Sequence, residues 1–212
     1  YQDILNEGDV SSFQPKVPET DDCYMLSYTS GTTGDPKGVK LTHKMILTMA
    51  TSLAHRICKG IDPICEADRY ISYLPASHSF EQGIFGLSCI RGMQVAFYNG
   101  DPIKMIQVDL PQFQPTLFPS VPRLYNRIYG RIQDRIAGLT GLKKRLTEYA
   151  IGVKLDNLKQ TGVTTHGCYD KIIFSKFKAL LGGNVRIMAT GSAPLSGEVI
   201  DFLKVCFSCP MS

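Results

Sequence analysis

The sequence predicts an α/β fold in which a mainly parallel sheet is flanked by helices. Short apolar runs alternate along the chain with longer amphipathic stretches, and Gly, Pro, Asp or Ser residues bound the runs. The chain has 212 residues with 43% hydrophobic content, which suffices for one sizeable core. Because strands that alternate with helices form crossover units, the strands should run parallel.

Five strands are expected, at residues 24–28, 70–74, 94–98, 116–118 and 185–189. The helices expected between them cover residues 42–57, 80–90, 102–110 and 122–136. Residues 142–181 should form two further helices, separated by a loop of small and β-branched residues at 161–167. We find no internal repeat and no low-complexity stretch. Residues 1–212 are therefore interpreted as a single segment of one domain.

The charge balance argues against a nucleic-acid partner. There are 23 basic and 19 acidic residues, which leaves a formal charge of +4 spread along the chain. This excess is too small for a nucleic-acid-binding domain, and a solvated surface of mixed charge explains it. The local run Lys143–Arg145 is interpreted as one face of a helix.

No apolar run approaches the roughly 18 residues that a membrane-spanning helix needs. The first residues also lack the basic start and apolar middle of a signal peptide. The segment is therefore expected neither to span a membrane nor to direct export. It begins without Met, so an anchor upstream remains compatible with it.

The cysteines indicate a reducing, cytosolic setting. Seven of them, an odd number, occur at spacings that form no paired framework. Cys206 and Cys209 have the spacing of zinc or redox sites, but no second Cys or His pair lies close by in the sequence. Free thiols are the favoured interpretation, and no metal ligand is assigned.

The stretch from Ser27 to Gly38 has the composition of a phosphate-binding loop. Glycines at 31 and 34 let backbone N–H groups converge on an anion, hydroxyl groups add neutral donors, and Lys37 adds a positive charge. Pro36 stiffens the exit before a helix near Thr42. An ordinary P-loop is excluded, because Pro36 stands where that pattern needs Gly. The alternative is a flexible strand-to-helix loop of chance composition.

This loop resembles the signature of the adenylate-forming superfamily, which includes acyl-CoA synthetases, luciferases and peptide-synthetase adenylation domains. In that superfamily the loop holds the β- and γ-phosphates of ATP while a carboxylate attacks the α-phosphate. The resemblance implies this role for Thr29, Ser30, Gly31, Thr32, Thr33, Gly34 and Lys37.

Leu74-Pro-Ala-Ser-His-Ser-Phe-Glu81 resembles a segment of fatty acyl-CoA synthetases. There the His lies near the reacting carboxylate, which makes His78 a candidate catalytic residue together with Lys37. A lone His is more often structural, and this alternative stays open for His78. Ala76 replaces a Leu that is common at this position, so the adjacent wall of the site could differ in shape.

The segment Val121-Pro-Arg123 and the helix after it are similar to long-chain members in particular. Arg123, Arg127 and Arg131 recur on one face of that helix. An exposed basic face and a phosphate or CoA contact are equally compatible with this spacing.

A small-residue turn follows the expected strand at 185–189. Such turns at the carboxyl ends of parallel strands are where α/β folds bind ligands, although a turn chosen for packing is the alternative. The corresponding family segment lines the adenine and acyl pocket. The resemblance therefore makes Gly191, Ser192, Ala193 and Pro194 nucleotide-site candidates.

Taken as a whole, the resemblance is to long-chain acyl-CoA synthetases. It implies activation of a fatty acid by ATP and Mg²⁺ to acyl-AMP and then transfer to coenzyme A. The protein is expected in the cytoplasm or on the cytosolic face of the endoplasmic reticulum or another membrane, associated through segments outside residues 1–212.

The family's Tyr-Gly-x-Thr-Glu and Thr-Gly-Asp segments and its C-terminal lid domain are not found in these residues. The 212 residues are therefore expected to form part of the N-terminal AMP-binding domain and to be inactive alone. Another acid:CoA ligase or adenylating enzyme, or a non-catalytic nucleotide-binding module, remains as an alternative.

Overall fold

The structure, a computed structural model, describes residues 14, 16–29, 35–58, 61–191 and 193–212. The chain divides into two compact units, Tyr1–Ile46 and Leu47–Ser212. Of the sequence-predicted site residues, Ser30 to Gly34 and Ser192 lie outside the described residues.

The first unit contains a β-hairpin. Strand β1 (Cys23–Thr29) pairs antiparallel with β2 (Lys37–Thr42), and helix α2 (His43–Ile57) follows at once. A strand at residues 24–28 and a helix from Thr42 were predicted, but no strand was predicted between them, and β2 corrects this. Apolar and polar residues alternate only from Val39 to Thr42. This run is too short to distinguish a strand from an irregular segment before a helix.

The second unit contains two parallel strand pairs. Strand β3 (Arg69–Ser72) pairs with β4 (Gln94–Phe97), and β5 (Leu117–Ser120) pairs with β6 (Ile187–Thr190). Thr116 joins the pairs, because its N–H donates to the Arg69 carbonyl at 2.8 Å and its Oγ1 accepts from the Arg69 N–H at 2.9 Å. The described residues thus hold six strands, of which these four confirm the parallel prediction.

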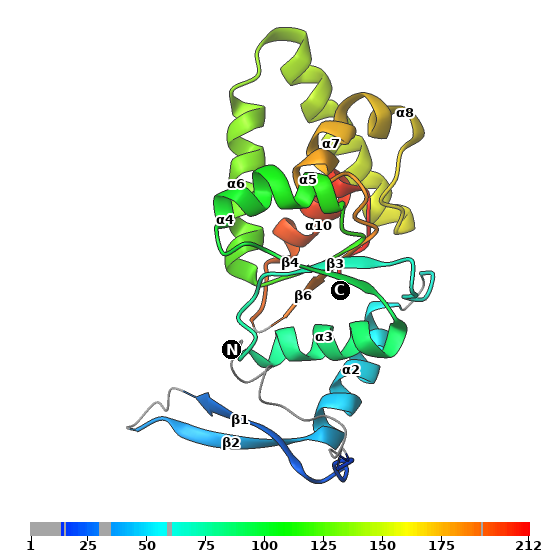
Figure 1. The fold of residues 1–212 in the computed structure, drawn as a ribbon. Coiled ribbons are helices and arrows are strands. Elements are labelled where there is room, and N and C mark those ends of the chain that lie inside the picture. The colour runs from blue at the N-terminus through cyan, green and yellow to red at the C-terminus, as the bar shows by residue number, and fades with distance from the viewer. Residues whose placement is uncertain (1–13, 15, 30–34, 59–60, 192) are drawn as a thin grey trace. The chain divides into compact units, whose positions relative to one another are not determined.

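Alternate residues of these strands pack on opposite faces, as the period of a strand requires. Tyr70, Leu117 and Ile187 pack in one core with Ala50 and Ala54 of α2 and with α3 (Ser79–Arg91). Their neighbours on the strands belong to a second core with α6 (Pro122–Ala137), α7 (Gly141–Thr161) and α10 (Gly197–Phe207). Figure 1 shows α3 on one side of the strands and α6 and α10 on the other.

The remaining helical segments largely match the expected ranges. Residues 102–113 form one helical run with a π-helical middle: α4 (Pro102–Lys104), η2 (Met105–Asp109) and α5 (Leu110–Phe113). The second helix expected before residue 181 consists of short pieces: α8 (Gly167–Tyr169), η3 (Asp170–Phe174), α9 (Ser175–Lys178) and η4 (Ala179–Leu181). No helix among the described residues is long and apolar enough to cross a membrane.

Cys206 and Cys209 are buried, free thiols at the end of α10. Burial raises the pKa of the Cys209 thiol to about 12. A thiol that keeps its proton is a poor metal ligand and a poor nucleophile. These two residues therefore act as small apolar side chains, in agreement with the favoured interpretation.

Candidate functional site

The described residues on either side of the predicted phosphate loop belong to the paired strands β1 and β2. In the strand register Thr29 lies opposite Lys37, so the two ends of the loop are held side by side. Tyr28 lies opposite Gly38, and a Cβ at Gly38 would stand 3.3 Å from the Tyr28 ring. The exposed Lys37 thus begins β2 beside the last residue of β1, and residues 30–34 lie outside the described residues.

In the second unit, the carboxyl ends of three strands meet. The Gly191 N–H, directly after β6, donates to the Ser120 carbonyl at the end of β5 at 3.4 Å. The Tyr73 hydroxyl, directly after β3, donates to the Pro119 carbonyl at 2.8 Å. These bonds hold the strand ends in one place, at the edge of the sheet where parallel α/β folds bind ligands.

Gly191 packs directly against Phe80 in the first turn of α3. A Cβ at position 191 would lie 2.6 Å from Phe80 Cδ2 and 2.7 Å from Phe80 Cε2. Real Cβ atoms do not approach so closely, so only Gly fits while Phe80 holds this position. The turn at the end of β6 and the start of α3, 111 positions apart in the sequence, therefore form one site.

His78 is the N-cap residue of α3. Its Nδ1 accepts a hydrogen bond from the Phe80 N–H at 3.1 Å, and its carbonyl accepts from the Gln82 N–H at 3.1 Å. Because Nδ1 accepts, the proton of the neutral ring lies on Nε2. The half-buried His78 thus presents an N–H donor away from the helix that it caps.

The first turn of α3 also contains a buried carboxyl group, that of Glu81. Glu81 is 2% exposed, and its Oε1 accepts from Ser72 Oγ at 2.5 Å and from the Tyr70 hydroxyl at 3.5 Å. Burial raises the pKa of Glu81, although the hydrogen bonds from Ser72 and Tyr70 act to lower it. Its Oε2 is buried without a hydrogen-bond partner in the described structure.

The structure thus brings some of the predicted site residues together. Gly191 lies beside the helix start that His78 caps, and Ala193 and Pro194 are exposed in the turn that leads from Gly191 to α10. Sequence reasoning missed Phe80. It stands inside the recognised His78 segment, but no local pattern marks it as the residue against which Gly191 packs.

Thr190 Oγ1, directly before Gly191, is buried without a hydrogen-bond partner in the described structure. Such an atom is unusual in a packed protein, and a hydroxyl can both donate and accept. Thr190 Oγ1 is thus an unpartnered polar atom beside Gly191 at the end of β6.

The same residues do not fit a metal ion. Across the described ranges, no group of three or more His, Cys, Asp or Glu side chains could hold a metal. Among the described residues, none is assigned to Mg²⁺.

Comparison with known proteins shows the family of the chain. The sequence profile described as "AMP-binding enzyme" matches residues 2–212. The chain belongs to the AMP-binding enzyme family. The resemblance to the adenylate-forming superfamily is thereby confirmed.

Two relatives of this chain are long-chain acyl-CoA synthetases. The peroxisomal long chain acyl-CoA synthetase 6 of Arabidopsis thaliana is 41% identical over 207 residues, which are 98% of this chain and 28% of the relative. Long-chain-fatty-acid–CoA ligase 5 of Rattus norvegicus is 38% identical over 211 residues, again 98% of this chain and 30% of the relative. The chain thus spans less than a third of the length of these relatives.

A solved structure confirms the fold. The A-PCP didomain of carboxylic acid reductase from Segniliparus rugosus, in complex with AMP, superimposes with a TM-score of 0.64 at 22% identity. The match covers 96% of this AMP-binding enzyme and 25% of that chain. The described strands and helices are therefore part of an α/β domain of this fold.

Proposed function

We propose that the full-length protein activates a long-chain fatty acid with ATP and transfers the acyl group to coenzyme A. The packing of Gly191 on Phe80 carries the proposal, because it joins the nucleotide-site turn to the His78 segment. The identity of 35–41% to long-chain acyl-CoA synthetases supports the choice of substrate. ATP supplies the adenylate and the pyrophosphate leaving group, and residues 1–212 supply one part of the AMP-binding domain.

In this proposal His78 holds the reacting carboxyl group. Its Nδ1 is occupied by the Phe80 N–H, so its Nε2–H is the donor available to a fatty acid oxygen. A fixed donor needs no reorganisation when charge develops on that oxygen. Lys37 and the hairpin loop would bind the polyphosphate, since a cation at the base of a Gly-rich loop pairs with phosphate oxygens.

Two variants at one position test the role of His78. In the full-length protein, His78→Asn keeps an N-cap side chain but removes the Nε2 donor, and His78→Ala removes both. We expect acyl-AMP formation to fall on the order of 100-fold in both. The melting temperature of each variant reports the loss of the helix cap, and its rate of pyrophosphate release reports the loss of the Nε2 donor.

His166 is the matched control, because it caps α8 in the same way, with its Nδ1 accepting from the Tyr169 N–H at 3.4 Å. His166→Ala should leave pyrophosphate release unchanged. If His78→Asn retained full activity, His78 would be a structural cap only.

Lys37→Ala in the full-length protein tests the phosphate loop. We expect a higher KM for ATP and slower pyrophosphate release, because a charge-assisted contact to phosphate is lost. Lys40→Ala, in the same strand, is the control. An unchanged rate and ATP dependence would refute the phosphate role of Lys37.

The substrate and the location are tested in the full-length protein. Acids of 8, 12, 16 and 20 carbons should be activated with a preference for the longer chains, whereas preference for a short or aromatic acid would indicate another acid:CoA ligase. We propose a cytoplasmic location, or one on the cytosolic face of a membrane, which the seven free cysteines favour. Fractionation of cells that express the full-length protein tests it.

A further inference from the structure

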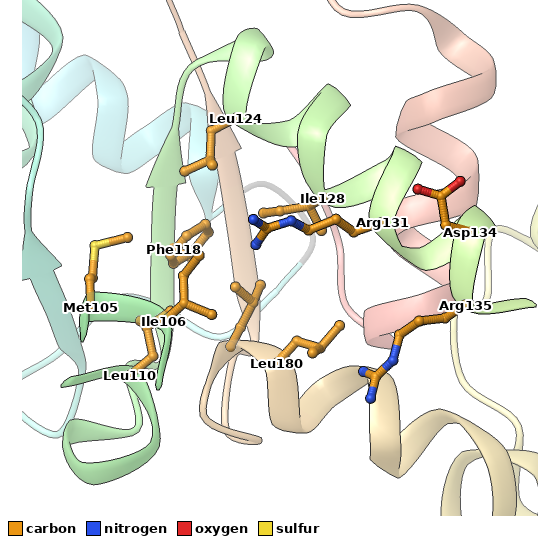
Figure 2. A pocket seen from close by; sticks show the side chains of 11 residues that line it. Met105, Ile106, Leu110, Phe118, Leu124, Ile128, Arg131, Asp134, Arg135 and Leu180 are labelled. Atoms are coloured by element: carbon orange, nitrogen blue, oxygen red, sulfur yellow. The ribbon is translucent and has the colours of Figure 1, made fainter. Parts of the chain in front are cut away.

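The structure contains an apolar pocket that the proposed function does not use. It lies between α6, η4 and the helical run at residues 102–113, has a volume of about 430 Å³, and is shown in Figure 2. This size is within the range of about 300–1,000 Å³ that is common for small-molecule sites.

The pocket lies on the opposite face of the strands from α3. Phe118 of β5 lines it and packs in the core of α6 and α10, whereas the adjacent Leu117 packs in the core of α2 and α3. Because successive strand residues point to opposite faces, the pocket is separated from His78 by the sheet. It is therefore distinct from the candidate site.

The walls of the pocket are aliphatic and aromatic. Met105 and Leu110 are almost fully buried, and Leu124, Ile128 and Leu180 complete the lining. A neighbouring cavity of about 330 Å³ shares Met105 and Leu124, but polar side chains such as Gln107 and Arg127 also line it, so it is not counted as part of the apolar pocket. The apolar walls of the first pocket suit a hydrocarbon chain.

The polar residues of the pocket are mainly cationic. Arg131 and Arg135 line it from α6, with Asp134 beside them, and Figure 2 shows the Arg131 guanidinium directed toward the apolar side chains. Within the part of the chain that the structure describes, neither arginine forms an ion pair. An arginine that is not already paired binds a carboxylate through two parallel hydrogen bonds.

We propose that this pocket is a second, non-catalytic binding site for a long-chain fatty acid. The hydrocarbon chain occupies the space between Met105, Phe118 and Ile128, and the carboxylate pairs with Arg131 and Arg135 at the rim. The inference follows from the shape and charge of the pocket and does not require that the protein activates fatty acids.

Photolabelling of the full-length protein tests this site. The probe is palmitic acid with a terminal diazirine, and adducts are mapped by peptide mass spectrometry. A palmitoyl sulfamate analogue of acyl-AMP, added in excess, blocks the candidate site at His78. We expect adducts within residues 102–113 and 122–137, with labelling unchanged by the analogue.

Two variants then test the apolar space and the charged rim of the pocket separately. Ile128→Trp fills the apolar space, and Arg131→Glu with Arg135→Glu reverses the charge. Each should lower labelling of these segments about tenfold, the loss of roughly 1.4 kcal/mol in binding. Leu142→Trp, at a position 84% exposed, and Arg145→Glu are the matched controls and should leave labelling unchanged. Melting temperatures identify variants that fail to fold.

Three results would overturn the proposal. Absence of adducts in both segments would mean that another part of the full-length chain covers the pocket. Loss of the adducts with the acyl-AMP analogue would make the pocket part of the catalytic acyl site. Equal effects of the pocket variants and the controls, in folded protein, would mean adventitious labelling of an apolar surface.

Discussion

Gly191 and Phe80 pack so closely that a single methyl group at residue 191 would lie 2.6 Å from the Phe80 ring. The contact joins the turn after β6 to the first turn of α3. Since Phe80 also donates its N–H to His78, any shift of its ring is transmitted to the cap of α3. The positions of the His78 segment and of the turn at Gly191 therefore both depend on the packing of Gly191 against Phe80.

Gly191→Ala should disturb this fit. Overpacking costs about 1–3 kcal/mol, and we expect a lower melting temperature together with slower pyrophosphate release by the full-length protein. Gly197→Ala is the control, because nothing lies within 4 Å of a Cβ there. Adding Phe80→Ala to Gly191→Ala should recover part of the stability. If the double variant were no more stable than expected from the two single losses, the steric explanation would be wrong.

Glu81→Gln tests the buried carboxyl group through its pH dependence. The pKa of Glu81 is raised by burial, so the folded protein keeps a proton that the unfolded chain loses above about pH 4.3. Wild-type stability should therefore fall as the pH rises from there through the raised pKa. Gln keeps an acceptor for Ser72 but does not titrate.

The stability of Glu81→Gln relative to wild type should thus increase with pH, by on the order of 1 kcal/mol. Urea denaturation at several pH values between 4 and 8 measures this difference. A constant difference across that range would mean that Glu81 titrates with its ordinary pKa. Glu148→Gln, at an exposed position of α7, provides the control.

Much of the fold was predictable from local patterns. Helices 43–57 and 122–137 were expected within one residue, because amphipathic periodicity and Pro122 at a helix start are local signals. Strand β2 was not predicted, because its apolar and polar residues alternate only over the four residues from Val39 to Thr42. Its pairing with β1 stabilises it, and pairing is not a local property.

The site was predictable only in part. Gly191 and His78 were proposed as site residues because they belong to recognisable segments, whereas the contact that Gly191 makes depends on a residue distant in the sequence. Phe80 against Gly191 and Thr116 against Asp68 are examples, the latter with Thr116 Oγ1 donating to Asp68 Oδ1 at 2.7 Å. Such pairs are brought together by the crossover connections between the strands. That topology depends on the whole sequence and cannot be predicted from any one local segment.

The ion pair of Asp68 and Arg186 should stabilise the amino ends of the strands. Arg186 Nε donates to Asp68 Oδ1 at 2.7 Å, and Asp68 is 3% exposed. Burial acts to raise the pKa of Asp68, but hydrogen bonds from Arg186, Thr116 and the Cys65 N–H hold it below its ordinary value. Its contribution to stability is therefore present above about pH 3.9 and is lost as the pH falls through the lowered pKa.

Arg186→Met should destabilise the protein by about 1–3 kcal/mol at neutral pH, because it leaves a buried carboxylate short of donors. The difference from wild type should shrink below about pH 4, where Asp68 takes up a proton. Thermal melts between pH 3 and 7 measure both effects. Arg145→Met is the control at an exposed position, and a loss that stayed constant down to pH 3 would contradict a role for the ionised Asp68.

Lys154 is a buried cation that joins three helical segments. It is 1% exposed, and its Nζ donates to Asp170 Oδ1 at 2.6 Å, to the Val205 carbonyl at 2.6 Å and to Ser208 Oγ at 2.8 Å. The ammonium also lies 4.1 Å from the centre of the Phe174 ring. Its partners come from η3 and from the C-terminal end of α10 and the residue after it.

Lys154→Met keeps the aliphatic stem but removes the charge, so Asp170 and the Val205 carbonyl lose their donor. Breaking such a pair costs about 3–5 kcal/mol, and we expect faster hydrogen exchange in α7, η3 and α10 and a lower melting temperature. Lys159→Met, at an exposed position of the same helix, should change neither. Adding Asp170→Asn to Lys154→Met should restore part of the protection, because the unpaired carboxylate is then absent. If it did not, the loss would reflect poor packing of Met rather than an uncompensated charge.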